Sequence, residues 1–126
     1  MHVARQFLML GAAACALAVL LGAFGAHALK SRLSPAMIEV YQTAVQYHFW
    51  HALGLIAVGL AALHIKDSSL LVWSGWLMFA GILLFSGSLY ALSMSGARWL
   101  GAITPLGGMA FMTAWTLFAI SAFKSL

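Results

Sequence analysis

Three histidines in apolar surroundings are the residues whose type and spacing could do chemistry in this chain. His48 and His51 are three residues apart, so a helix would place them on one face, and His27 closes an earlier apolar run. Imidazole nitrogens bind metal ions and haem iron, and a histidine changes charge near neutral pH. The set permits three functional hypotheses: a metal site, a haem site, and a path for protons or solutes.

A fourth interpretation is structural, because neutral histidines also hydrogen-bond one membrane helix to another. The chain has a single cysteine, Cys15, and the only nearby carboxylate is Glu39. Few side chains are therefore available to complete a metal site with the histidines. Ser86-Gly87-Ser88 lacks a positioned acid and is better explained by close helix packing than by a nucleophile. We therefore predict no catalytic residue, no metal ligand and no cofactor, and we predict that the chain is not an enzyme.

The elements that must position these residues follow from where the charges fall. Only 6% of the 126 residues are charged and 64% are hydrophobic, whereas soluble domains carry about 25% charged residues. The charges leave four uncharged stretches, each long enough for the roughly 20 apolar residues that cross a bilayer. In hydrocarbon such stretches must be helical to satisfy their backbone. The uncharged stretches are 6–29, 40–65, 68–97 and 99–123.

We predict an all-α membrane protein of one domain, residues 1–126, with four antiparallel transmembrane helices. A short amphipathic interfacial helix is expected before the second span, because Ser34-Pro35 is a helix start and apolar residues then recur at i, i+3 and i+4. Pro105, Gly107 and Gly108 predict a kink or local unwinding in the first third of the last span. The predicted spans are about 6–29, 45–63, 70–94 and 100–123.

Alternating span directions would gather the neutral polar side chains in one half of the bilayer, beside the turns that carry Lys30, Arg32 and Arg98. Intramembrane polar and ionisable groups are costly, so this half is where a functional surface is expected. The predicted polar cluster consists of His27, His48, His51, Ser86, Ser88, Tyr90 and Thr104.

Small residues recur every four positions in the first apolar run, which predicts a smooth ridge for helix packing. A partner helix is expected there, either within the monomer or from a homo-oligomer or another membrane protein. The lipid bilayer is the expected environment, and a nucleic-acid partner is not expected because the basic residues are spread over separate turns. The ridge residues are Ala14, Ala18, Gly22 and Ala26.

The location and orientation follow from the same charges. The run from Phe7 to Ala26 exceeds a signal-peptide core, so it is predicted to be a retained span. Basic residues balance across the predicted membrane, three on each side, so only the N-terminal amine favours cytoplasmic N- and C-termini on one side. The predicted location is the bacterial inner membrane.

Four motifs follow one another along the chain: Leu21-Gly22-Ala23-Phe24-Gly25-Ala26-His27, His51-Ala52-Leu53-Gly54-Leu55, Phe85-Ser86-Gly87-Ser88-Leu89-Tyr90 and Ile103-Thr104-Pro105-Leu106-Gly107-Gly108. In this order and spacing they resemble the YgdD-like family of small inner-membrane proteins, a domain-of-unknown-function family. The resemblance covers essentially the whole chain and implies four membrane helices, with no established activity, substrate, cofactor or catalytic residue. His27 and His51 match positions of the family motifs, whereas His48 does not.

Together these observations predict an integral inner-membrane protein that acts as a packing or accessory component and forms oligomers. Two alternatives stay open. One is a channel or transporter-like protein that uses the polar cluster, and the other is a metal- or haem-binding redox component.

Overall fold

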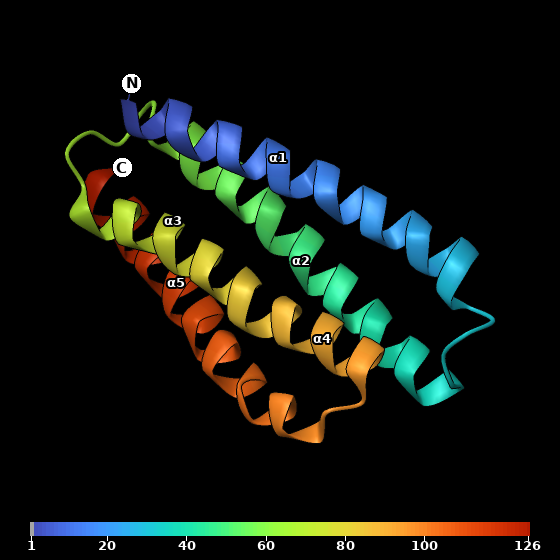
Figure 1. Ribbon diagram of the computed structural model, residues 1–126. Helices are drawn as coiled ribbons and strands as arrows, with labels where there is room; N and C mark the ends of the chain where they lie inside the picture. The colour runs from blue at the N-terminus through green and yellow to red at the C-terminus, as the bar shows by residue number, and fades with distance from the viewer. Residues whose placement is uncertain (1) are drawn as a thin grey trace.

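The computed structural model describes residues 2–126, and these form four helical rods that lie side by side (Figure 1). The two ends of the chain lie at the same end of the molecule. The first rod is α1 (His2–Phe24) with the π-helix η1 (Gly25–Leu29), and the second is α2 (Pro35–Ala61). The third is α3 (Ser69–Gly81), the π-helix η2 (Ile82–Ser86) and α4 (Gly87–Ser95), and the fourth is the 3₁₀-helix η3 (Arg98–Ala102) with α5 (Thr104–Ser125).

The all-helical prediction is confirmed, but four transmembrane helices plus a separate interfacial helix is wrong. Three stretches of the described chain are long and apolar enough to cross a membrane: His2–Leu29, Ser69–Ser95 and Arg98–Ser125. The predicted span at 45–63 is not among them, and residues 35–61 form one continuous helix in place of an interfacial helix and a span. The physical reason is that a stretch without formal charge is not necessarily hydrophobic, because glutamine, histidine and tyrosine side chains on α2 lower its hydropathy.

The helix starts follow the local capping chemistry of the sequence. The Ser34 hydroxyl accepts from the backbone N–H of Met37 at 3.3 Å, and Pro35 occupies the first turn, as Ser34-Pro35 predicts. Near Pro105, where the sequence predicts a kink or local unwinding, η3 ends at Ala102 and α5 begins at Thr104, so the proline lies in the first turn of a helix.

The longest helix contact joins α1 to α2 through small residues of α1 seven positions apart. A side chain added at Gly11 would lie 2.9 Å from the backbone nitrogen of Ile56, which is closer than real side chains approach. Seven residues advance a helix by nearly two whole turns, so this spacing keeps one narrow line facing α2. The buried residues on that line are Ala4, Gly11, Ala18 and Gly25.

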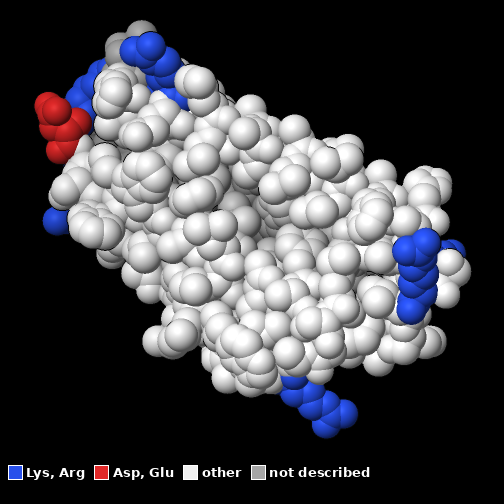
Figure 2. Space-filling model, in the orientation of Figure 1, with Lys and Arg blue, Asp and Glu red and all other residues white. Residues whose placement is uncertain are grey.

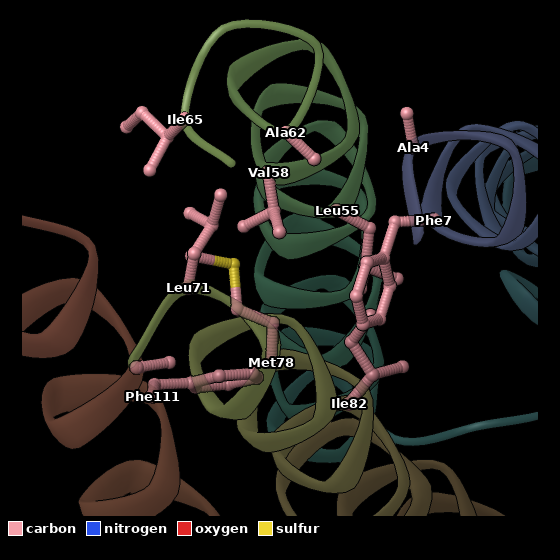
Figure 3. Close-up of a cluster of buried hydrophobic side chains, with 11 residues drawn as sticks. Ala4, Phe7, Leu55, Val58, Ala62, Ile65, Leu71, Met78, Ile82 and Phe111 are labelled. Carbon is pink, nitrogen blue, oxygen red and sulfur yellow. The ribbon is translucent and has the colours of Figure 1, made fainter. Parts of the chain in front are cut away.

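A cluster of buried apolar side chains holds the rods together near the chain ends (Figure 3). Phe7 of α1 is fully buried against Gly75 of α3 and meets the Trp76 ring edge-on, with ring centroids 5.1 Å apart. Leu55 and Met78 supply the middle of the cluster from α2 and α3. This half of the molecule is therefore joined mainly by apolar packing.

Charged side chains are confined to the ends and turns of the rods. Figure 2 shows Lys, Arg and acidic side chains at the extremities of the viewed face, separated by an uncharged middle. This distribution fits a protein whose middle lies in hydrocarbon and whose ends meet the headgroups.

Candidate functional site

His51 lies in a closed aromatic cage between α2 and α5, and its exposed fraction is 5%. The Phe111 ring stacks on the imidazole with ring centroids 3.4 Å apart, and the Tyr47 ring is nearly parallel to it at 6.2 Å. The indole N–H of Trp115 donates to His51 Nε2 at 3.0 Å, and His51 Nδ1 lies 2.7 Å from the Tyr47 carbonyl oxygen. Both ring nitrogens are therefore engaged.

These partners assign the proton on His51. An indole nitrogen can only donate, so Nε2 of His51 must be the unprotonated nitrogen. A carbonyl oxygen can only accept, so the proton is on Nδ1 and is donated to Tyr47. A metal ion, a haem iron or a second proton would have to displace Trp115, so the arrangement favours a neutral, structural histidine.

His48 links α2 to a different rod, and its exposed fraction is 2%. His48 Nδ1 lies 2.8 Å from the Tyr90 hydroxyl of α4, and Ala14 of α1 lines the same recess as these two residues. Tyr90 in turn meets the Tyr41 ring edge-on, with centroids 5.4 Å apart. His48 therefore joins three rods around one point.

Tyr41 connects this point to the π-helix at the end of α1. Its hydroxyl donates to the backbone carbonyl of Leu21, and its ring occupies the space that a side chain at Gly25 would need. A π-helical turn shifts the backbone pairing of an α-helix, and such turns are frequent at functional sites. Glycine at position 25 is what allows the tyrosine ring to approach the backbone here.

The predicted hydroxyl groups form two further links, both between helical segments. Ser86, at the end of the second π-helix, donates to the Ala44 carbonyl of α2 at 2.8 Å. The Ser88 and Thr104 hydroxyls lie 2.6 Å apart and join α4 to the first turn of α5. Each is a short link from one rod to another, so they act as interhelical hydrogen bonds.

His27 is not brought together with the other histidines. Its side chain is exposed in η1, whereas His48 and His51 are buried. Among residues 2–126, no group of three histidine, cysteine, aspartate or glutamate side chains could hold a metal ion. The predicted polar cluster is thus divided into the His51 cage, the His48–Tyr90 pair, the two serine links and an isolated His27.

The predicted ridge residues also divide between different neighbours. Ala18 is buried against α2, and a side chain added at Gly22 would lie 3.4 Å from Val45. Ala14 and Ala26 line separate recesses. A four-residue step turns a helix by 40° beyond a full turn, so three steps rotate the line by 120° and away from one partner.

An apolar groove, here called the α1–α4 groove, lies between α1 and the rod that contains α3, η2 and α4. Its volume is about 320 Å³, and the His48–Tyr90 pair is at its base. Figure 2 shows the uncharged middle hollowed between these rods. The remaining walls are apolar and include Ala13, Ala14, Leu17, Leu83 and Gly87.

A second groove, here called the Gln46 groove, lies where η1 and the end of α1 meet α2. Its volume is about 240 Å³. Gln42 and Gln46 are exposed on its α2 wall, and the α1 wall consists of the small residues Gly22, Gly25 and Ala26. It therefore combines a smooth backbone surface with two side-chain amides.

Sequence reasoning missed several residues that complete these sites. No motif or spacing pointed to Trp115, yet its indole is a hydrogen-bond partner of His51. Tyr47 could have been found, because it precedes His51 by four residues and so lies on the same helix face. Ser74, which donates to the Ala114 carbonyl at 2.7 Å and links α3 to α5, had no signal beyond its polarity in an apolar run.

Similar proteins agree with the membrane character of the fold. A UPF0382 membrane protein of Bacillus subtilis, YwdK, is 50% identical over 122 residues, which cover 97% of this chain and 99% of that protein. UPF0382 membrane proteins of Staphylococcus haemolyticus and Staphylococcus saprophyticus are 45% and 44% identical over 121 residues, covering 95% of this chain and 97% and 98% of those proteins. No solved structure matches the chain.

The family model described as "Protein of unknown function (DUF423)" matches residues 21–108, which include the whole predicted polar cluster. The expected membership in a family of membrane proteins of unknown function is thereby confirmed, as is the membrane location. The chain belongs to the DUF423 family.

Proposed function

We propose that this chain is a non-enzymatic packing or accessory component of the bacterial inner membrane that associates with a second copy of itself. Within DUF423 we assign it to the YgdD-like proteins, on the four motifs quoted above. We also propose that both termini face the cytoplasm. The position of both chain ends at one end of the molecule supports their sharing a side (Figure 1).

The hydrogen bonding of the interior supports a structural role for its polar groups. Within the described part of the chain, no buried side-chain nitrogen or oxygen lacks a partner. The partners of His48, His51 and Ser86 lie on other helical segments or on the backbone, so these groups are engaged in joining rods. A general base or a proton relay needs a group that can exchange its partner, and the closed cage around His51 provides none.

The Gln46 groove is the observation that carries the proposed self-association. Exposed glutamine amides on a membrane protein form hydrogen bonds between helices, and small residues let two backbones approach closely. Both features occur here on one surface, since Gln42 and Gln46 face the same recess as Gly22 and Ala26. A two-fold dimer would bury this surface against itself.

Cysteine cross-linking tests this association. The native thiol is first removed by Cys15→Ala, and Gln46→Cys is then compared with Leu106→Cys, an exposed apolar position on α5. In vesicles of phosphatidylethanolamine with phosphatidylglycerol, Gln46→Cys should form a disulfide dimer and Leu106→Cys should not. A monomer at every protein-to-lipid ratio, with no cross-link at position 46, would contradict the proposal.

The two alternative functions have their own tests. A proton path through His48 would change the internal pH of sealed vesicles under an imposed membrane potential, and a pH-sensitive dye inside the vesicles would report it. We expect the proton flux to be no larger than in vesicles without protein. A flux that His48→Phe abolishes would support the channel. A Soret band or stoichiometric metal in the purified protein would support the redox component.

A further inference from the structure

The α1–α4 groove is apolar along its whole length even though two polar side chains form its base. His48 Nδ1 and the Tyr90 hydroxyl are 2.8 Å apart and bonded to each other, and the surface that the groove exposes is almost entirely apolar. Among the residues that the structure describes, no lysine, arginine, aspartate or glutamate lines the groove. Its occupant must therefore be uncharged and apolar over the length that it contacts.

The dimensions of the groove favour a hydrocarbon chain over a helix. It runs along α1 from Leu10 to Leu21, which is about 16 Å of helix at 1.5 Å per residue. A helix of that length, about 10 Å across, would occupy roughly 1,300 Å³, whereas the groove holds about 320 Å³. Carbon atoms touch at about 4 Å, so a single alkyl chain of the same length needs roughly 200 Å³. The groove therefore has room for one alkyl chain, whereas a helix could lie across it but could not enter it.

Small residues keep the groove open. A side chain added at Gly87 would meet nothing closer than the Ile82 carbonyl oxygen at 4.0 Å, so position 87 borders empty space. Ala13 and Ala14 face it from α1. The walls belong to two candidate membrane spans, so the space opens into hydrocarbon and not into water.

The charge beyond one end of the groove selects the kind of lipid. Leu21 closes the α1 wall, and Lys30 follows nine residues later, about 13 Å further along the rod. The turns at this end carry Lys30, Arg32 and Arg98 against the single acidic residue Glu39. An excess of positive charge at headgroup level attracts anionic phospholipids.

From these observations we propose that the α1–α4 groove holds one acyl chain of an anionic phospholipid, whose headgroup lies at the turn that contains Lys30 and Arg32. This goes beyond the proposed self-association and uses a different surface. The bound chain fills the space between α1 and the third rod and shields the His48–Tyr90 pair. The protein thus carries a specific lipid as part of its packed structure.

Photolabelling tests the occupant. The full-length protein is placed in phosphatidylcholine vesicles doped with phosphatidylglycerol that carries a diazirine on its acyl chain, and labelled residues are mapped by peptide mass spectrometry. Labelling should concentrate on Leu17 and Leu83 in the groove and exceed that of Leu20, which is exposed elsewhere on α1. The excess should be smaller with a diazirine phosphatidylcholine probe.

Two sets of variants separate the groove from its charged end. Gly87→Leu fills the groove and should abolish the labelling excess, whereas Gly101→Leu, also bordered by open space but outside the groove, should leave it unchanged. If Gly87→Leu lowers the melting temperature, Ala13→Leu is used instead to fill the groove. Lys30→Gln with Arg32→Gln should remove the preference for phosphatidylglycerol, and Arg5→Gln with Lys124→Gln at the opposite end should preserve it.

Three outcomes would overturn the proposal. Equal labelling of Leu17 and Leu20 would mean annular lipid only. An unchanged excess in both Gly87→Leu and Ala13→Leu would place the lipid elsewhere. If a photoreactive amino acid introduced at position 83 formed a cross-link to a second protein molecule, another copy of the chain would be shown to cover the groove. None of these results bears on the disulfide at position 46, so the two proposals fail separately.

Discussion

The two histidines of α2 lie three residues apart but in opposite kinds of surroundings. His51 is sealed between Phe111, Tyr47 and Trp115, and both of its nitrogens have fixed partners. His48 has one bonded partner on α4 and lies at the base of a groove that opens between two rods. The two sides of α2 thus differ: the side of His51 is filled by aromatic side chains, and the side of His48 borders the α1–α4 groove.

The difference arises from the residues that face α2 on each side. On the closed side, aromatic rings from η2 and α5 fill the space, and Gly81 and Gly107 are small enough to admit Phe111 and the Phe85 backbone. On the open side, alanines of α1 and Gly87 face each other without a large side chain between them. Residue volume therefore decides which histidine is sealed.

The largest expected effect is on the closed side, at Gly107. A methyl group there would collide with the backbone of Phe85, which cannot move without disturbing η2. Gly107→Ala should therefore lower the free energy of unfolding by about 2–3 kcal/mol, measured by thermal unfolding in detergent. Gly108→Ala is the matched control, since its methyl group would lie 3.9 Å from the Phe85 ring and should be tolerated. Equal losses for both would contradict the packing of the closed side.

The next effect is expected at His51 itself. His51→Leu keeps most of the volume but leaves the buried indole N–H of Trp115 without its acceptor, which costs about 1–3 kcal/mol. His51→Gln should recover part of that loss, because its side-chain oxygen can accept from the indole. Melting curves and the tryptophan emission maximum would report both changes, with the exposed His64→Leu as control. A stable His51→Leu protein with unchanged emission would disprove the cage.

A smaller effect is expected on the open side. Tyr90→Phe removes the hydroxyl that bonds His48 but keeps the ring that meets Tyr41. Interhelical hydrogen bonds in membrane proteins average about 0.6 kcal/mol, so the loss should stay near that value. Double-mutant cycles on unfolding free energy should give a larger coupling for His51 with Trp115 than for His48 with Tyr90. The reverse order would remove the distinction between the two sides.

An effect of similar size, and the only stabilising one, is expected at Gly87. A methyl group there meets no atom closer than 4.0 Å, and alanine restricts the unfolded chain more than glycine does. Gly87→Ala should therefore raise the unfolding free energy by about 0.5–1 kcal/mol, seen as a higher melting temperature. A fall in melting temperature would show that the groove is closed around position 87.

Local chemistry made parts of the fold predictable. Ser34-Pro35 had to start a helix, because a serine hydroxyl caps the first turn and proline there loses no hydrogen bond. The apolar runs had to be helical, because in hydrocarbon their backbone N–H and C=O groups can hydrogen-bond only within the segment. The prediction for residues 35–63 was wrong, because a stretch without charge was taken to be a hydrophobic span preceded by a separate interfacial helix, whereas α2 is one continuous helix of lower hydropathy. Its polar side chains instead serve the neighbouring rods as hydrogen-bond partners.

The membrane character, the helical content and the presence of a few polar groups among apolar ones depend on composition and on residues a few positions apart, so they can be predicted from the chain alone. Which polar groups meet is a property of the folded molecule, because His51 and Trp115 are 64 residues apart and His48 and Tyr90 are 42 apart. Such pairs depend on how the rods rotate about their axes. That rotation is set by the volumes of glycines, alanines and aromatic rings at contacts between rods, which no single helix reveals.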